Sequence, residues 1–457
     1  MSSVHRPSKI IRFSISLLYL VSTFAATEAA DLAISSITAI DAKNGVRKNQ
    51  TILIKDAKII TVGKDNEIVI PYGTKTLNGR NLFAIPGLWD AHVHFSYDKE
   101  IAPAMLPLFL ANGITYVRDT GGPINKVRYW KAVAKSDPTE NPQVFMAGPL
   151  LDGIPTVYTG ETMTFPLLAE TVATPYEGMQ TVTKLAQQGV EFVKAYEMLD
   201  SDTFASILDQ ATALNLPVAG HIPLEMDAIE VSSFGLDSIE HLRNLEISCS
   251  TERNAILKER RALLASGNKK PGGSLRKQAH DAHRLLAIDT LDWEQCKEVL
   301  DYHIANKTYH NPTTALLEST YDPFLIHRDW VATFDDLPKN IARQWKKSVF
   351  QAVEDALPKD EKTKRQYTDY MAWARRVIDY LGGKGMILAG TDTPIYFLTP
   401  GASLHKELEA LVRAGMSPME ALAAATIVPA QYFGLEKDRG LLEVDMLADI
   451  VILKKDP

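Results

Sequence analysis

The sequence predicts an α/β protein built as a (β/α)8 TIM-like barrel, with a small β-sandwich domain formed by its N- and C-terminal segments. Three observations support this prediction. Hydrophobic residues make up 46% and charged residues 23% of the 457 residues, as in soluble globular proteins. From Pro86 onward, short apolar strands alternate with helical stretches, which is typical of a parallel sheet. The two terminal segments instead show strand patterns separated by turns.

The alternating region, residues 86–435, offers the eight strands that such a barrel requires. A helix over 404–413 supports the alternation, because its apolar residues recur on one face. Two helical insertions are expected near 248–310 and 322–380, and Pro271-Gly272-Gly273 divides the first into two helices. The predicted barrel strands are 88–94, 115–119, 144–147, 192–195, 218–221, 238–241, 309–313 and 386–392.

The β-sandwich domain is expected to combine residues 30–85 with residues 436–457. Residues 440–443 and 448–453 return to a strand pattern near the end of the chain. The chain ends at Pro457, and we expect this unit to lack a final strand or two. The strands predicted in the N-terminal part are 33–40, 51–54, 58–63, 68–70 and 81–85.

The first residues have the pattern of a secretory signal. Arg6, Lys9 and Arg12 precede an apolar run that ends at Ala26, and small residues follow it. The run is short for a membrane span, which needs roughly 20 apolar residues. We expect residues 1–29 to be a cleaved signal peptide, with an uncleaved anchor as the alternative. The mature protein would be periplasmic or secreted, with no stable membrane span.

The charge and the cysteines exclude several classes of protein. A net charge of −7 leaves no basic excess for phosphates, so we expect no nucleic-acid partner. Cys249 and Cys296 are too few for a disulfide framework or a thiolate zinc cluster. Any metal must therefore be bound by nitrogen and oxygen ligands. Export would allow the two cysteines to pair, but two free buried thiols are the favoured expectation.

The sharpest chemical signal is Asp90-Ala91-His92-Val93-His94, at the end of the first predicted barrel strand. Residues two apart on a strand point to the same side, so both histidines face the barrel axis. Two imidazoles at the carboxyl end of a strand form half of a site for Zn²⁺ or a similar ion. A His-x-His pair alone is a weak signal, and its position at the start of the alternating region strengthens it.

Four further polar residues, Lys194, His221, His241 and Asp392, each end a different predicted strand. Each of these residues, taken alone, could have a purely structural role. The histidines could lie in the core, the lysine on the surface, and the aspartate could cap the N-terminus of a helix. Their coincidence argues against these readings, because barrel active sites assemble at this edge of the sheet. So many polar residues in apolar strands would be costly to bury without an ion.

These motifs resemble those of the amidohydrolase superfamily, in the expected order and over almost all of residues 31–457. The most similar subgroup is the imidazolonepropionase-like amidohydrolases, which include metal-dependent dipeptidases acting on Xaa-Pro and related dipeptides. The motifs are Pro-Gly-Leu-Trp-Asp-Ala-His-Val-His from Pro86, Val193-Lys194, Ala219-Gly220-His221, Ile239-Glu240-His241, Ala389-Gly390-Thr391-Asp392-Thr393 and Leu447-Ala448-Asp449-Ile450-Val451.

The resemblance implies a binuclear centre of two divalent ions, with Zn²⁺ as the first candidate and Mn²⁺ or Co²⁺ as alternatives. Burial would lower the pKa of Lys194, and the neutral amine could then add CO₂. A water shared by two ions would act as hydroxide, and Asp392 would serve as base and then as acid. The implied ligands are His92, His94 and Asp392 for one ion, His221 and His241 for the other, and Lys194 as a carbamate that bridges both.

We therefore expect a metal-dependent hydrolase that cleaves an amide C–N bond of a small substrate by a metal-bridging hydroxide. A dipeptide or an N-acyl amino acid is the leading substrate, and a cyclic amide of the imidazolone or lactam type is the alternative. A deaminase is disfavoured, because Glu225 does not follow His221 at the deaminase spacing. A non-catalytic metal-binding relative is disfavoured, because every implied ligand is retained.

Contacts to the substrate are less defined by the sequence. Arg243 could bind a substrate carboxylate in bidentate fashion, with a surface ion pair as an equal alternative. Tyr196 and Tyr158 could hydrogen-bond a developing oxyanion, although aromatic packing is favoured for both. The partner is a small-molecule amide or dipeptide, and a homo-oligomer is left open. We expect the insertion at 248–310 to lie over the barrel mouth and to set specificity.

Overall fold

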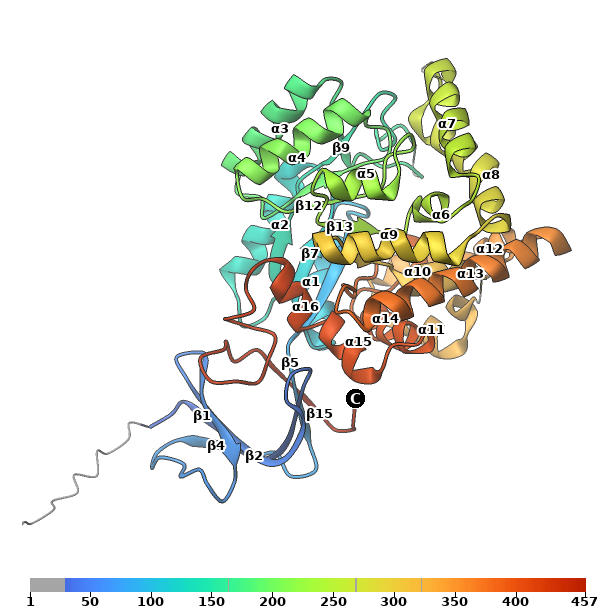
Figure 1. Ribbon diagram of the computed structural model, residues 1–457. Coiled ribbons are helices and arrows are strands. Elements are labelled where there is room, and N and C mark those ends of the chain that lie inside the picture. Colours follow the sequence, from blue (N-terminus) through green and yellow to red (C-terminus); the bar gives the residue numbers. More distant parts are fainter. Residues whose placement is uncertain (1–28, 163, 268, 322) are drawn as a thin grey trace, which may run out of the picture.

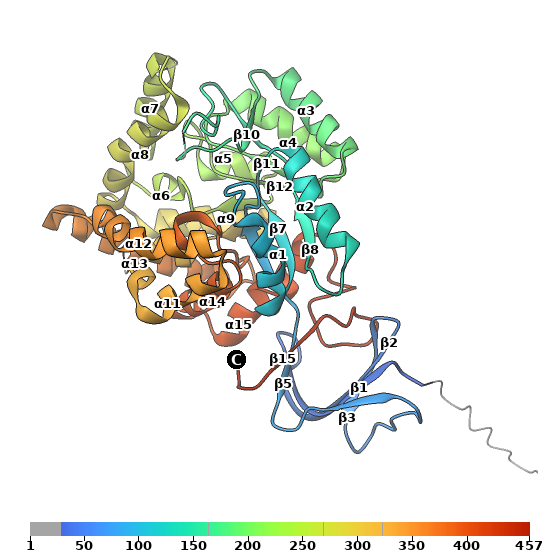
Figure 2. The same cartoon turned by 180° about the vertical axis from the view of Figure 1, so that it is seen from behind.

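The computed structural model describes residues 29–457 apart from residues 163, 268 and 322 (Figure 1). The predicted signal peptide therefore lies outside the described residues, except for its last residue. In the part of the chain that is described, no helix is long and apolar enough to cross a membrane. A barrel surrounded by helices makes up most of the protein, and a small sheet lies at one end of it (Figures 1 and 2).

The barrel wall consists of parallel strands in two sheets, ordered β6-β7-β8 and β10-β9-β11-β12-β13-β14. The predicted strands from 88–94 to 309–313 all coincide with observed strands. The third predicted strand, 144–147, corresponds to β8, and the chain continues as β9 after a break at Gly148 (φ +81°). β8 pairs with β7, and β9 pairs with β11. The bounds are β6 Leu88–Val93, β7 Ile114–Asp119, β8 Gln143–Met146, β9 Leu150–Asp152, β10 Ala169–Thr171, β11 Val193–Ala195, β12 Val218–Gly220, β13 Ser238–Glu240 and β14 Tyr309–Asn311.

The eighth predicted strand, 386–392, is not a regular strand, but its backbone still closes the barrel. The Leu388 amide donates to the His310 carbonyl at 2.8 Å, and the Asp392 amide donates to the His92 carbonyl at 2.7 Å. The segment therefore lies between β14 and β6. Gly390 permits this close approach, because a Cβ there would come within 2.7 Å of the His92 amide nitrogen.

The small sheet combines both ends of the described chain. Its order is β15-β5-β1-β2-β3, with β4 beside β1, and β15 runs antiparallel to β5. Its apolar side includes Ile34, Ile52 and Leu442. This mostly antiparallel unit agrees with the predicted β domain. The bounds are β1 Leu32–Asp41, β2 Gly45–Lys55, β3 Lys58–Lys64, β4 Lys75–Asn78, β5 Phe83–Pro86 and β15 Ile450–Leu453.

Two strands predicted for this unit do not form, and one strand was missed. Residues 68–70 and 440–443 carry no strand, although Ile68 and Ile70 pack against the sheet. Ile68 and Ile70 are partly buried, and Leu441 and Leu442 are buried, without any pairing of these backbones in a sheet. The missed strand is β4, whose residues are all exposed. An exposed strand has no apolar alternation, so the pattern could not reveal it.

Helices surround the barrel, and aspartates cap several of them. Asp200, Asp227, Asp292 and Asp360 accept hydrogen bonds from backbone amides in the first turns of α4, α5, α9 and α13. One large apolar core joins these helices to the strands. The helices outside the insertions are α1 Ala102–Ala111, α2 Ile124–Ser136, α3 Pro175–Gln187, α4 Ser201–Ala213, α5 Ala228–Ser233, α6 Leu245–Ser248, α14 Ala402–Arg413, α15 Pro418–Ala424 and α16 Ile427–Tyr432, with the 3₁₀ turn η3 Ile395–Phe397.

Both predicted insertions are helical, and the first splits at Pro271 into α7 and α8 as expected. The α7–α8 hairpin lies at the opposite end of the molecule from the small sheet (Figures 1 and 2). The inserted helices are α7 Arg253–Gly267, α8 Gly272–Asp289, α9 Trp293–Asn306, α10 Thr314–Tyr321, α11 Arg328–Thr333, α12 Lys339–Ala356 and α13 Glu361–Gly382, with η1 Phe324–Ile326 and η2 Phe334–Asp336.

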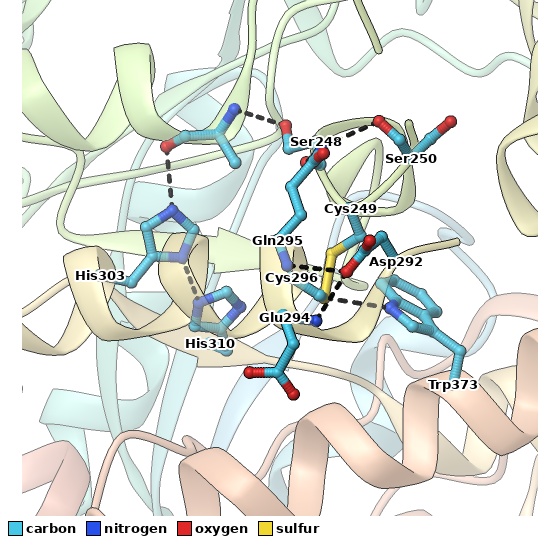
Figure 3. The surroundings of a disulfide bond; sticks show 11 residues. Ser248, Cys249, Ser250, Asp292, Glu294, Gln295, Cys296, His303, His310 and Trp373 are labelled. Atoms are coloured by element: carbon cyan, nitrogen blue, oxygen red, sulfur yellow. Dashed lines mark hydrogen bonds between the residues drawn. A yellow bond between two sulfur atoms is a disulfide. The ribbon is translucent and has the colours of Figure 1, made fainter. Parts of the chain in front are cut away.

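A disulfide joins Cys249 to Cys296 at the base of this hairpin (Figure 3). The expectation of two free thiols was therefore wrong. Tertiary packing decides whether the two cysteines pair. Cys249 follows α6, Cys296 lies in the first turn of α9, and backbone hydrogen bonds bring these two places together. The Asp292 amide donates to the Cys249 carbonyl at 2.9 Å, and the Thr251 amide donates to the Thr290 carbonyl at 3.0 Å.

Candidate metal centre

The predicted ligands come together at the carboxyl ends of the barrel strands. His92 lies on β6 and Lys194 on β11, and the other histidines directly follow β6, β12 and β13. Asp392 lies in the segment that closes the barrel. All of these residues are at most 7% exposed. The fold therefore gathers residues that are far apart in the sequence into one buried polar cluster.

Asp392 lies at the centre of this cluster. Its Oδ1 atom is 3.3 Å from His92 Nε2 and 3.1 Å from His94 Nε2, and its Oδ2 atom is 3.8 Å from His241 Nε2. Ligand atoms of His92, His241 and Asp392 all lie within 4.8 Å of one another. The ring of His221 is 5.0 Å from that of His241. The aspartate thus contacts both of the predicted ligand groups.

The Nδ1 atom of each histidine is fixed by the protein. Thr313 Oγ1 donates its proton to the Pro312 carbonyl, so it accepts the hydrogen bond from His241. An imidazole that donates through Nδ1 and carries no second proton keeps its lone pair on Nε2, as metal-binding histidines require. The Nδ1 partners are Glu240 Oε2 for His92 at 2.6 Å, the Gly121 carbonyl for His94 at 2.9 Å, Glu197 Oε1 for His221 at 2.7 Å, and Thr313 Oγ1 for His241 at 2.7 Å.

A buried arginine holds the carboxylate behind His92. Arg118 Nη2 donates to Glu240 Oε1 at 2.7 Å, and both side chains are fully buried. Burial alone would raise the pKa of Glu240, but Arg118 and Lys194 outweigh it and hold that pKa well below its usual range. Glu240 therefore stays ionised and remains an acceptor for the His92 ring.

Sequence reasoning missed Glu240 and Glu197. A signal was present, because Glu240 directly precedes His241 and Glu197 follows Lys194 by three residues. Each carboxylate, however, contacts a histidine on another strand: Glu240 contacts His92, and Glu197 contacts His221. Such pairs depend on which strands are neighbours in the barrel, and no local spacing reveals them.

Two residues of the cluster have left-handed backbone conformations. His241 has φ +62° and Asp392 has φ +66°, in a region that is costly for residues with a Cβ. Backbone hydrogen bonds hold both residues in place, from the His241 amide to the Asn311 carbonyl and from the Asp392 amide to the His92 carbonyl, each at 2.7 Å. Stored strain of this kind clusters at functional sites.

Lys194 has a buried amine that the described residues leave unsatisfied. It is 1% exposed, and its Nζ atom has no hydrogen-bond partner in the described part of the chain. Burial lowers the pKa of this amine to about 8, although Glu240 acts in the opposite direction. A substantial fraction of the amine is then neutral near pH 7–8. An orphaned, partly deprotonated lysine among ligands is the feature that carbamylation would resolve.

The donor set fits a divalent metal centre. Burial lowers the pKa of His221 to about 3, so its ring is neutral at pH 7. Burial also holds the pKa of His241 well below its usual range. For Asp392, burial would raise the pKa, but His92 and His241 outweigh it and keep the carboxylate ionised. Neutral imidazoles around a carboxylate are ligands that Zn²⁺ and similar ions prefer.

The predicted substrate residues lie beside His221. The Tyr196 ring is 4.4 Å from the His221 ring, and the Tyr158 ring packs edge-on against Tyr196 at 5.8 Å. The guanidinium of Arg276, on α8, lies 5.5 Å from the Tyr196 ring centre. The Nε atom of Arg243 is buried without a hydrogen-bond partner among the described residues. Cationic and aromatic groups therefore border one side of the cluster.

Comparison with known proteins gives partial sequence matches. Residues 362–457 match the model of the amidohydrolase family. Urease subunit alpha 1 of Streptomyces avermitilis is 31% identical over 101 residues, which are 20% of this chain and 17% of that protein. Imidazolonepropionase of Kosmotoga olearia is 32% identical over 79 residues, 17% of this chain and 18% of that protein. The chain thus matches less than a fifth of the length of these curated relatives.

Solved structures match almost the whole chain. A Xaa-Pro dipeptidase with methionine bound in its active site has a TM-score of 0.64 at 18% identity, over 93% of this chain and 94% of that chain. Bottromycin amidohydrolase has a TM-score of 0.65 at 19% identity, over 93% of this chain and 81% of that chain. The ochratoxinase of A. niger has a TM-score of 0.61 at 17% identity, over 94% and 91%.

The fold is that of the barrels in these solved structures, and the C-terminal residues 362–457 are similar to the amidohydrolase family. The predicted resemblance to the amidohydrolase superfamily is confirmed by the C-terminal family match, the imidazolonepropionase match and the structural relatives. The predicted α/β barrel with its separate small sheet is confirmed as well.

Proposed function

We propose that this protein is a metal-dependent hydrolase that cleaves the amide C–N bond of small substrates. The observation that carries the proposal is the buried cluster around Asp392, in which the Nδ1 atoms of four histidines are held by protein acceptors. The unsatisfied Lys194 completes the set. The family match and the structural relatives support the same chemistry.

The chain's own residues would bind the ions and move the protons. His92, His94 and Asp392 are one ligand group, and His221 with His241 is the other. Two bound ions, with Zn²⁺ as the first candidate, would lower the pKa of a coordinated water and polarise the scissile carbonyl. Asp392 would accept the proton of the attacking water and pass it to the leaving nitrogen.

Lys194 would contribute through its carbamate. The neutral amine adds CO₂ and releases one proton, which converts a potential cation into an anionic oxygen ligand. An unmodified ammonium at this place would repel bound cations by several kcal/mol, or roughly 4 kcal/mol for unit charges 4 Å apart at an effective dielectric of 20. Burial in an apolar strand therefore favours the modified form whenever ions are bound.

We propose a dipeptide or an N-acyl amino acid as the substrate. Arg243 and Arg276 lie near Tyr196 and His221, where they can attract a carboxylate on the substrate. The Xaa-Pro dipeptidase among the structural relatives agrees with this substrate class. A cyclic amide is the second candidate, which the partial match to imidazolonepropionase favours.

A panel assay of the full protein tests the proposal. Metal would be removed with a chelator, and Zn²⁺, Mn²⁺ or Co²⁺ would be added back before dipeptides, N-acyl amino acids and cyclic amides are offered. We expect turnover of an amide only after metal is restored, and none in a His92→Ala, His94→Ala double variant. A protein that binds the ions but cleaves no amide would instead be a metal-binding relative.

We also propose that the protein is exported, from the composition of residues 1–29. The disulfide between Cys249 and Cys296 supports this, because disulfides persist mainly in oxidising compartments. N-terminal sequencing of the mature protein would test the proposal, with a start after Ala29 expected and an intact Met1 as the contrary result.

A further inference from the structure

Glu197 links the candidate metal centre to the α7–α8 insertion. Its side chain is fully buried just beyond β11. Its Oε1 atom accepts from His221 Nδ1 at 2.7 Å and from Arg276 Nε at 2.9 Å. Its Oε2 atom accepts from His280 Nε2 at 2.8 Å and from Asn244 Nδ2 at 3.2 Å. One carboxylate thus binds a predicted metal ligand and two side chains of α8.

Arg276 and His280 reach Glu197 because they lie four residues apart on one face of α8. Leu275 and Ala279, each one residue before Arg276 and His280, belong to an apolar cluster with Tyr196 and Leu224. This contact places α8 against residues that follow the barrel strands β11 and β12. The predicted position of the insertion at the barrel mouth agrees with this packing, while its effect on specificity stays a prediction.

The hairpin that carries α8 is anchored at its other end by the disulfide (Figure 3). Cys249 follows α6, and Cys296 lies in the first turn of α9, so the bond closes the base of α7–α8. The covalent base limits how far α8 can move, and the contacts with Glu197 fix where it lies. Loss of the α8 donors would leave a buried carboxylate with fewer partners, which is strongly unfavourable.

We propose that α8 supplies part of the metal centre. Arg276 and His280 are positioning residues that hold Glu197, and Glu197 holds His221 with its Nε2 atom towards the ion. Docking of α8 then strengthens binding of the ion at His221, and binding of the ion stabilises docked α8. The two effects are equal in free energy because coupling is reciprocal. This inference rests on the proposed metal-dependent function and adds to it two residues from the insertion.

Metal titrations of matched α8 variants test the proposal. Arg276→Met removes the guanidinium but keeps an unbranched apolar side chain. It should lower the binding affinity for one of the two Zn²⁺ ions by about 10–100-fold. The other ion should bind as in the wild type. Lys277→Met is the matched control, because the Lys277 side chain is 73% exposed on the same helix. His280→Phe should weaken the same ion, and His280→Gln, which keeps a donor, should restore it.

Hydrogen exchange tests the coupling. Its main comparison, with and without Zn²⁺, uses the unmutated protein and so carries no risk of misfolding. Backbone amides of α8 should exchange more slowly with Zn²⁺ bound than after chelation, and Arg276→Met should abolish that difference. Equal exchange in both states, or wild-type Zn²⁺ affinities in Arg276→Met and His280→Phe, would overturn the inference alone. A wild-type protein that binds no divalent ion would overturn the proposed function, and this inference with it.

Discussion

Asp90 and Thr391 join the first and last segments of the barrel wall. Thr391 Oγ1 donates to Asp90 Oδ2 at 2.8 Å, and the Thr391 amide donates to Asp90 Oδ1 at 3.1 Å. Asp90 lies two residues before His92, and Thr391 directly precedes Asp392. The pair therefore fixes the distance between two predicted ligands that lie on opposite ends of the barrel sequence.

Asp90→Ala should destabilise the protein and loosen the metal site together. Two buried donors of Thr391 lose their acceptor, which costs about 1–3 kcal/mol each. Urea unfolding and Zn²⁺ titration would measure the two effects, with Asp209→Ala, an exposed change on α4, as the control. Unchanged Zn²⁺ affinity in a folded Asp90→Ala variant would show that the pair does not position Asp392.

Lys194→Ala should lose at least one bound ion per chain. The carbamate that we propose as the bridge cannot form, and activity should fall with the lost metal. A short carboxylic acid in the buffer should partly restore both by occupying the vacated space. Elemental analysis in bicarbonate buffer would measure the stoichiometry, with the exposed Lys184→Ala as the control. Two ions bound as tightly as in the wild type would exclude Lys194 as a ligand.

Asp392→Asn should keep the fold and remove most of the turnover. The amide cannot accept the proton of the attacking water, and general acid–base assistance is worth about 10²–10⁴-fold. Weaker metal binding should add to this loss. The turnover number of the Zn²⁺-saturated variant measures the effect, and circular dichroism checks the fold. Retention of more than roughly a tenth of the wild-type rate contradicts the proposed role.

Glu407 should make stability fall as the pH rises. It lies buried on α14, where its Oε2 atom accepts from the Ala315 amide at 2.7 Å. Burial raises its pKa from 4.5 to about 8. Between these values the folded state keeps a proton that the unfolded state has lost, so each pH unit costs up to ~1.4 kcal/mol. Unfolding free energies at about pH 5 and pH 8 should therefore differ less in Glu407→Gln than in the wild type. An equal difference in both proteins would show that Glu407 titrates normally.

The disulfide should stabilise the base of the α7–α8 hairpin. Its cysteines are 47 residues apart, and closing a loop of this size contributes about 4 kcal/mol in the chain-entropy model. A Cys249→Ala, Cys296→Ala double variant should unfold at a lower denaturant concentration and be cleaved faster within residues 250–295 by a protease. If both properties match those of the wild type, the bond contributes nothing to stability.

Local patterns were enough to predict the barrel strands and the residues gathered in the cluster. His92 and His94 follow from a two-residue period, and the other members follow from their places at strand ends. The closing segment is not a regular strand, and Gly390 lets it approach His92 closely. Sequence patterns predict the order of such elements along the chain. They do not predict how closely the closing segment approaches His92.

The supporting residues could not be predicted in the same way. Glu197, Arg276 and His280 meet only because an insertion folds back over the barrel, and no spacing in the sequence reports that path. The disulfide was misjudged for the same reason, since the position of Cys296 depends on how α9 returns from the hairpin. Contacts between separate elements are set by tertiary packing, which a single sequence does not display.

The pairing of β15 with β5 has a consequence for the order in which the protein forms. Residues 450–453 are synthesised after all of the barrel strands, yet they lie antiparallel to residues 83–86, directly before the first barrel strand. The Gly87 amide also donates to the Asp449 carbonyl at 2.7 Å. Until the ribosome has released residues 450–453, the edge of β5 that β15 covers is open to other strands. The small sheet is therefore completed only after the whole barrel has been synthesised, and the nascent chain exposes that edge until then.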